Sequence, residues 1–190
     1  MAWVNERNIL SSARRREGVR FLFGRRRRTA RGLGVKFQVP SVFASMTVAQ
    51  NLSVAAARMW RDCVTRAHEV AGTLAALGLD ELADMPAGSL AHGQRQWLEI
   101  GMAIIQRPRL LLLDEPTAGM SPEETSCTGA LLLRLNKAGV TVLAIEHDMD
   151  FVRQVARNVT VLHLGKVFFE GSFEEVVRSQ AVAEIYAGIA

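Results

Sequence analysis

The sequence predicts an α/β fold in which a parallel sheet is flanked by helices and interrupted by a small helical insert. Residues 110–113 are four leucines without polar alternation, which is typical of a strand buried on both faces. A second β-rich run at 140–145 follows after one helical segment, and strand–helix–strand units form right-handed parallel crossovers. Between residues 41 and 92, in contrast, apolar residues recur at helical spacing.

Composition fits one globular domain. The chain has 190 residues, 49% hydrophobic and 22% charged. Its apolar runs are all much shorter than the roughly 20 residues of a membrane span, and its arginine-rich start lacks the apolar core of a signal peptide. Cys63 and Cys127 lie far apart in dissimilar segments, which predicts reduced thiols without a disulfide or a zinc site.

The positive charge is concentrated at the N-terminus. Residues 1–30 hold nine arginines against Glu6 and Glu17, a balance of +7, so the other 160 residues carry −3 of the chain's +4. We expect residues 1–31 to form an arginine-rich, irregular segment, poorly ordered over 1–16, with a short strand at 18–24. Nucleic acid is not an expected partner, because no aromatic residues interleave with the arginine runs and no reader motif follows.

The second predicted unit spans 32–190 and begins with a strand. Pro40 pushes Val39 toward extended geometry, so the strand that starts near Gly34 should end there. Thr47 and Gln50 have the spacing of a capping box, which opens a helix. A second helical stretch covers about 66–77 and closes at a plausible glycine C-cap. We therefore expect a helical subdomain at about 41–92.

The elements after this subdomain alternate between helices and strands. A helix follows the polar turn 90–94 and stops at Pro108. Residues 121–124 combine an N-cap serine, a proline at the first helical position and a reciprocal glutamate, so they open a helix that ends near Gly139. The remaining expected elements are a helix capped by Asp148, a hairpin of strands 159–164 and 167–169, and last helices that open at Ser172.

Two carboxylates follow the leucine strand directly. Asp114 and Glu115 would lie at its carboxyl end, where ligands bind in open α/β sheets. Asp114 can hold Mg²⁺, directly or through water, and Glu115 can orient or deprotonate an attacking water. The alternative interpretation is a buried strand that meets an acidic turn.

Several motifs together, in this order, resemble an ATP-binding cassette over about residues 32–189. A glutamine loop at Gln38, LAHGQ at 90–94, LLLLDEP at 110–116, AGMS at 118–121 and a strand ending in His147 are similar to the Q-loop, signature, Walker B, D-loop and switch histidine of ABC transporter ATPases. The stretches HGQRQWLEIGMAI, PTAGMSPEET and AIEHDMDFVRQVARNVTVLHLGKVFFEGS look closest to the importers of branched-chain amino acids and urea. The end, AEIYAGIA, is similar to the urea-type subunit.

The resemblance implies a P-loop-NTPase-like ABC ATPase core that uses ATP and Mg²⁺ to drive transport. Asp114 would hold Mg²⁺ at the β- and γ-phosphates, and Glu115 would be the general base for the attacking water. His147 would contact the γ-phosphate. Gln38 would reach the metal or the water and link the site to the membrane subunit through the helical insert.

Other residues would act across a dimer. The resemblance implies that the signature turn faces the nucleotide of a partner subunit, with the D-loop Ser121 nearby; the turn consists of Leu90, Ala91, His92, Gly93 and Gln94. The implied partners are a second ABC ATPase subunit, identical or different, and transmembrane permease subunits, with a periplasmic binding protein as an indirect partner. The implied location is the cytoplasmic face of the bacterial inner membrane, as a peripheral protein.

The pattern breaks at the phosphate-binding loop. Such enzymes carry Gly-x-x-x-x-Gly-Lys-Ser/Thr, but the three lysines of this chain, Lys36, Lys137 and Lys166, are followed by Phe, Ala and Val. Residues 17–24 look like the strand that normally follows this loop and its helix, so we expect an N-terminally truncated or degenerate cassette. Ala91 stands where the family has serine, which removes one phosphate donor.

Two hypotheses follow from these observations. The chain is the ATPase of an importer for urea or branched-chain amino acids, acting as one half of a nucleotide-clamped dimer. Alternatively it is a catalytically incompetent cassette that serves only as a partner or regulator, or a non-functional fragment. We expect the chain alone to be inactive. A Gly-rich Gly-Lys-Ser/Thr loop in the DNA upstream of codon 1 would discriminate between these hypotheses.

Overall fold

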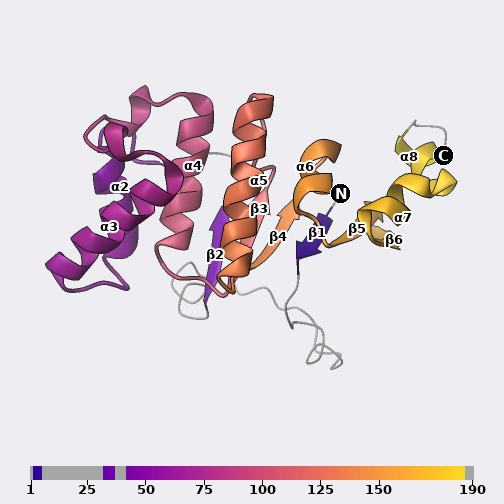
Figure 1. Cartoon of the computed structure of the whole chain (residues 1–190), viewed down its shortest axis with the longest axis horizontal. Coiled ribbons are helices and arrows are strands. Elements are labelled where there is room, and N and C mark those ends of the chain that lie inside the picture. Colours follow the sequence, from indigo (N-terminus) through magenta and orange to yellow (C-terminus); the bar gives the residue numbers. More distant parts are fainter. Residues whose placement is uncertain (1, 6–31, 37–41, 187–190) are drawn as a thin grey trace.

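A six-stranded sheet runs through the computed structural model, which describes residues 2–5, 32–36 and 42–186 of the chain (Figure 1). The strand order across the sheet is β2-β3-β4-β1-β5-β6. The bounds are β1 (Ala2–Asn5), β2 (Leu33–Lys36), β3 (Leu110–Asp114), β4 (Thr141–Ile145), β5 (Asn158–His163) and β6 (Lys166–Gly171).

The three strands β2, β3 and β4 are parallel neighbours, as predicted for the leucine run and the run at 140–145. Lys36 is aligned with Leu113, and Asp114 is aligned with Ile145. Leu111 and Leu113 are buried, while Leu110 and Leu112 are half-buried, so both faces of β3 are covered. The carboxyl ends of the three strands therefore meet at one edge of the sheet.

Strand β1 differs from the expectation that residues 1–31 are irregular. It lies between β4 and β5 and runs antiparallel to both, so β4 and β5 run in the same direction. Without β1, facing backbone groups of β4 and β5 would lose their partners, and Trp3 and Val4 are residue types that favour extended backbone. The arginine runs and the strand expected at 18–24 lie outside the described residues.

Helices occupy the segment between β2 and β3, as expected. They are α2 (Val48–Ala56), α3 (Cys63–Leu77), the short η1 (Asp80–Leu82) and η2 (Ala87–Ser89), and α4 (His92–Ile104). The predicted capping box is present: the Thr47 hydroxyl accepts from the Gln50 amide at 3.1 Å, and the Gln50 side chain accepts from the Thr47 amide at 2.9 Å. Gly78 ends α3 at φ 66°, as its predicted C-cap role requires.

The buried residues of α2, α3 and α4 form one apolar cluster that continues into the sheet core. A Cβ on Gly101 of α4 would lie 2.5 Å from the Leu77 Cδ1 atom of α3, so this glycine permits the close approach of the two helices. Helix α4 in turn contacts β2, and Figure 1 shows α2 and α3 on the far side of α4 from the sheet.

Helices α5 (Pro122–Lys137) and α6 (Met149–Val155) pack against each other, and α5 contacts β4. Each begins at a predicted cap. The Ser121 hydroxyl accepts from the Glu124 amide at 3.2 Å, and the Asp148 carboxylate accepts from the amides of Asp150 and Phe151. These caps fix the two turns that follow β3 and β4.

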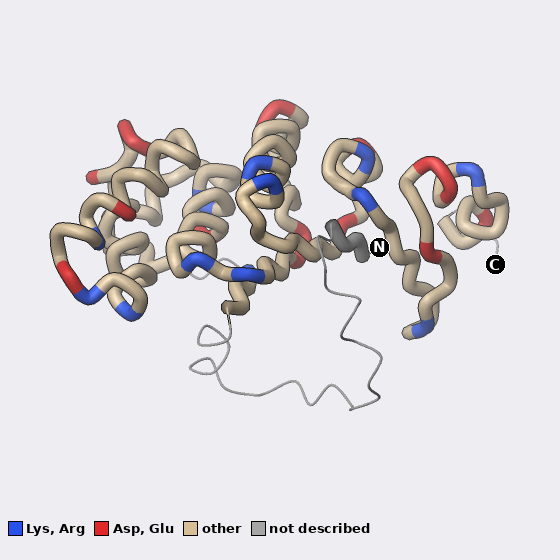
Figure 2. Tube along the Cα trace, turned by 60° about the horizontal axis from the view of Figure 1, so that its bottom comes forward, with Lys and Arg blue, Asp and Glu red and all other residues tan. Residues whose placement is uncertain are grey.

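The C-terminal part contains the predicted hairpin of β5 and β6 and then α7 (Phe173–Arg178) and α8 (Gln180–Tyr186). Leu164 and Gly165 both have positive φ, which matches a two-residue hairpin turn. Both cysteines are free and exposed. Among the described helices, none combines the length and the apolar character needed to span a membrane. Acidic and basic positions are interspersed over the described part (Figure 2).

Candidate functional site

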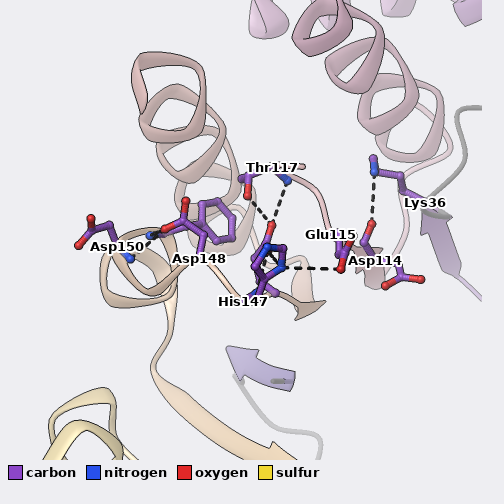
Figure 3. A network of polar contacts seen from close by, with 9 residues as sticks. Lys36, Asp114, Glu115, Thr117, His147, Asp148 and Asp150 are labelled. Atoms are coloured by element: carbon purple, nitrogen blue, oxygen red, sulfur yellow. Dashed lines mark hydrogen bonds and ion pairs between the residues drawn. The ribbon is translucent and has the colours of Figure 1, made fainter. Parts of the chain in front are cut away.

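The carboxyl ends of β2, β3 and β4 bring five ionisable side chains to one edge of the sheet (Figure 3). Lys36 ends β2 and Asp114 ends β3, with Glu115 as the next residue. Glu146 and His147 directly follow β4. Sequence reasoning predicted Asp114, Glu115 and His147 as a functional group, and the structure places them together.

Glu115 is held in a left-handed backbone conformation at φ 44°, which is unfavourable for a residue with a side chain. Its amide donates to the Ile145 carbonyl at 2.9 Å, which ties the turn after β3 to the end of β4. The Glu115 Oε1 atom lies 3.7 Å from His147 Nδ1, and these side chains are 30% and 70% exposed. Both groups can therefore be reached by a ligand from solvent.

Glu146 is a functional candidate that the sequence analysis missed. Its carboxylate is buried, with 1% of the residue exposed, and accepts from the Thr117 amide at 3.1 Å and from the Thr117 hydroxyl. Its other oxygen accepts from the His147 amide at 2.8 Å and lies 3.4 Å from His147 Nδ1. Glu146 thus joins the turn that carries Glu115 to the residue His147. The period of two along β4 could have placed it on the buried face with Val142 and Ala144.

Lys36 is the second residue that the sequence analysis missed as a site residue. Only 3% of it is exposed, and its Nζ donates to the Asp114 carbonyl at 3.4 Å. Burial lowers the pKa of the Lys36 ammonium, while the negative charges of nearby carboxylates, Glu99 first, act in the opposite direction. The alternation along β2, where Gly34 is also buried, was the available signal.

The signature turn is built into the N-terminus of α4. Leu90 is part of the core, and the amide of Ala91 donates to the Gln94 side chain at 3.1 Å. His92 Nε2 lies 3.0 Å from the Ala118 carbonyl, so the tautomer protonated at Nε2 donates to it. This contact connects the turn to the loop that follows Glu115.

Close packing fixes this end of α4 against the start of α5. A Cβ on Gly93 would lie 2.3 Å from the Glu124 Oε1 atom, so the two helix starts are nearly in contact. Glu124 also accepts from the Ser121 amide at 2.9 Å, which completes the capping box of α5. The Ser121 hydroxyl therefore serves as a helix cap in this structure, and its role toward a nucleotide stays a prediction. Gln38 lies outside the described residues.

The residues at this edge suit a magnesium ion that is shared with a phosphorylated ligand. Among the described residues, no group of three or more His, Cys, Asp or Glu side chains is arranged to hold a metal by itself. Mg²⁺ is commonly bound by one or two carboxylates, with water and substrate phosphates as its other ligands. The Asp114 carboxylate fits that donor set. Mg²⁺ bound there would supply charge neutralisation for phosphate, while Glu115 is placed to accept a proton.

The α/β fold, with its parallel strands and flanking helices, is of the P-loop-NTPase-like class. Comparison with known proteins identifies the family. The family model described as "ABC transporter" matches residues 8–118. The chain is 35% identical over 174 residues to the high-affinity branched-chain amino acid transport ATP-binding protein BraF of Pseudomonas aeruginosa, a match that covers 83% of this chain and 68% of BraF. The chain belongs to the ABC transporter family.

Further relatives and solved structures agree with this assignment. LivG of Salmonella typhimurium, another branched-chain amino acid transport ATP-binding protein, is 34% identical over 80% of this chain and 66% of its own length. The methionine import protein MetN 1 of Rhodococcus jostii is 37% identical, but the chain spans only 44% of it. A nucleotide-free ATP-binding cassette from an ABC transporter superposes with a TM-score of 0.73 and 27% identity, covering 83% of this chain and 69% of that one. For cbiO1 of Clostridium perfringens the TM-score is 0.72, with 30% identity over 84% and 64% of the two chains.

Proposed function

We propose that this chain is the ATP-binding subunit of an importer for branched-chain amino acids, with urea as the alternative cargo. The observation that carries the proposal is the convergence of Asp114, Glu115 and His147 at one sheet edge, with 3.7 Å between Glu115 Oε1 and His147 Nδ1. The cargo rests on the names of BraF and LivG, which are branched-chain amino acid transport proteins.

The proposed roles follow from position and exposure. Asp114 is the metal ligand at the end of β3, and Glu115 is the general base because its partly exposed carboxylate can accept a proton from water. His147 is exposed beside Glu115 and can donate to a phosphate oxygen. Gln38 is the proposed link to metal and permease, on the basis of its motif alone. Glu146 connects the turn that carries Glu115 to His147 and so fixes the position of the two side chains relative to each other.

A second candidate function is a cassette that cannot hydrolyse ATP alone and completes the site of a partner. The sequence contains no Gly-x-x-x-x-Gly-Lys-Ser/Thr loop, and the ring of backbone amides, the lysine and the hydroxyl of that loop normally provide most phosphate affinity. The start of α4, in contrast, keeps Gly93 and Gln94, although Ala91 replaces the serine of the family, and it needs no phosphate loop of its own. Gly93 and Gln94 would there face a nucleotide held by the partner, where the helix dipole favours phosphate.

The proposed assembly is a dimer of this chain with a second ABC ATPase subunit, attached to permease subunits at the cytoplasmic face of the membrane. A periplasmic binding protein would deliver the cargo to the permeases. The cargo is thus tested on the whole transporter, by uptake of labelled leucine and labelled urea with and without this chain. Loss of leucine uptake alone supports the first cargo, and loss of urea uptake alone supports the second.

Phosphate release separates the two candidate functions. The purified chain, an intact ABC ATPase subunit of the same transporter, and their mixture are compared at saturating MgATP. The second candidate function predicts that the mixture releases more phosphate than the intact subunit does. It also predicts that the chain alone releases none. Ala91→Trp should abolish the gain because the indole at this exposed position blocks the signature turn, while a change of the exposed Glu81 to Gln should not. Phosphate release by the chain itself would support the first candidate, and the absence of both that release and a gain in the mixture would contradict both candidates.

A further inference from the structure

Lys36 is an unusual residue for its position, because a lysine is seldom buried to this degree without a specific charge environment. It lies at the last position of β2 with 3% of its surface exposed. Its Nζ donates to the carbonyl of Asp114, the proposed metal ligand, at 3.4 Å. Figure 3 shows the Lys36 side chain beside the end of β3, on the same sheet edge as Glu115 and His147.

Four carboxylates act electrostatically on the Lys36 ammonium: Glu99, Asp114, Glu146 and Glu115, which we call the carboxylate cluster. They come from α4, from the ends of β3 and β4 and from the turn after β3. Glu99 and Glu146 are buried as well, with 7% and 1% exposed. Buried carboxylates without a cation would repel one another strongly, because the interior screens charge poorly.

We propose that the Lys36 ammonium is the resident counter-ion of the carboxylate cluster and that it opposes the binding of a divalent cation at Asp114. A divalent ion at the Asp114 carboxylate would bind to the residue whose backbone carbonyl lies 3.4 Å from Lys36 Nζ, a positive charge that is buried and acts electrostatically on that carboxylate. The inference rests on the proposed function only in taking Asp114 as the metal ligand. It concerns the chain without nucleotide, where no phosphate adds negative charge.

The geometry favours this role over direct contact with a phosphate. A side chain that is 97% buried has no free path to a ligand in solvent, and its Nζ is directed to a backbone carbonyl inside the structure. The ammonium thus acts through its charge. Even with water-like screening, repulsion between an ammonium and a divalent ion a few ångströms away corresponds to about a tenfold change in affinity.

The test is Mn²⁺ binding to the purified full chain, measured by electron paramagnetic resonance of free Mn²⁺ in the absence of nucleotide. Lys36→Met removes the charge and nearly keeps the side-chain length, so Mn²⁺ should bind at least about tenfold more tightly than to the unaltered chain. Lys36→Arg keeps the charge and should bind as weakly as the unaltered chain. Asp114→Asn, added to Lys36→Met, should remove the gain.

A second pair of variants protects the test against loss of folding. Lys36→Met removes a positive charge that interacts with Glu99, so Lys36→Met with Glu99→Gln is compared with Glu99→Gln alone, and circular dichroism confirms the fold of each. Removal of the lysine should again raise Mn²⁺ affinity. The proposal is overturned if Lys36→Met binds Mn²⁺ no more tightly than the unaltered chain and Lys36→Met with Glu99→Gln binds it no more tightly than Glu99→Gln alone. The metal result stands apart from the proposed function: a tenfold gain in Mn²⁺ affinity would keep the role of Lys36 even if the mixture with an intact subunit showed no gain in nucleotide binding or phosphate release.

Discussion

The buried carboxylate of Glu146 should be essential for the stability of the site, and Glu146→Ala tests this. The side chain accepts three hydrogen bonds, from the Thr117 amide, the Thr117 hydroxyl and the His147 amide. The substitution leaves all three donors without this acceptor in a place where Glu146 is 1% exposed. The two turns that carry Glu115 and His147 would then lose their main polar connection.

The magnitude follows from these bonds and from the charge. A hydrogen bond to a charged acceptor contributes about 1.5–3 kcal/mol, while removal of a buried carboxylate recovers several kcal/mol of desolvation. We expect the free energy of unfolding to fall by about 2–4 kcal/mol. Glu81→Gln, a change at an exposed acidic residue, should stay within about 0.5 kcal/mol of the unaltered chain.

Urea denaturation measures the stability change, and hydrogen exchange locates it. In Glu146→Ala the amides of Thr117 and His147 should exchange faster, since Glu146 is the acceptor for both. The amides inside α3, on the far side of α4, should change only through global stability. An unchanged free energy of unfolding together with unchanged exchange at Thr117 and His147 would refute the role of Glu146 as a connection between the two turns.

Three further predictions concern other parts of the molecule. Gly93→Ala should destabilise the chain by only about 0.5–1 kcal/mol in urea denaturation, because the added Cβ would lie 2.3 Å from Glu124 Oε1, the flexible end of a side chain that can move away at the loss of its hydrogen bond to the Ser121 amide; a loss above about 2 kcal/mol would mean that Glu124 cannot move. Arg107→Ala should lower stability by about 0.5–1 kcal/mol because the guanidinium lies 4.5 Å from the Trp60 ring centroid and 2.8 Å from a Glu69 carboxylate oxygen; an unchanged midpoint in urea denaturation would mean that neither contact contributes. In a hybrid cassette that carries a grafted phosphate loop, Glu115→Gln should retain bound ATP without hydrolysing it, because metal binding stays while the base is lost; unchanged phosphate release would remove Glu115 from that role.

The sequence contained enough information for the parallel part of the sheet and for most helix starts. Burial on both faces leaves an unalternating run such as 110–113, and capping residues such as Thr47 and Ser121 act within one helical turn. These are local signals, so they can be interpreted without knowing the partners. The same holds for the hairpin of β5 and β6, whose turn needs positive φ at two adjacent residues.

Strand β1 and the two buried charges were not predictable in the same way. Residues 2–5 pair with two strands more than 135 positions away in the sequence, and such long-range pairing leaves little local trace. Lys36 and Glu146 interrupt apolar alternation with charge, which normally marks an exposed position. The buried Lys36 interacts electrostatically with Glu146, which follows β4, and with Glu99 of α4. Only the assembled structure brings these three residues together.

The candidate catalytic residues were predicted by motif, and their convergence depends on topology. Asp114 and His147 are 33 residues apart in the sequence and meet because β3 and β4 are parallel neighbours. For Ser121 and Gln94, in contrast, the motif did not reveal the contacts that the structure shows. In the described structure both side chains are engaged in helix capping, a function that the motifs alone do not distinguish from nucleotide contact.

The central claim is that this chain completes the nucleotide site of a partner subunit through its signature turn, while its own sheet edge carries Asp114, Glu115 and His147 without a phosphate loop in the sequence. Isothermal titration calorimetry with MgATP, on the chain alone and on its mixture with an intact ABC ATPase subunit, tests it most directly. The account predicts no micromolar binding to the chain alone, and tighter binding in the mixture than to the intact subunit by itself. Micromolar affinity of the chain alone, or no gain in the mixture, would contradict it.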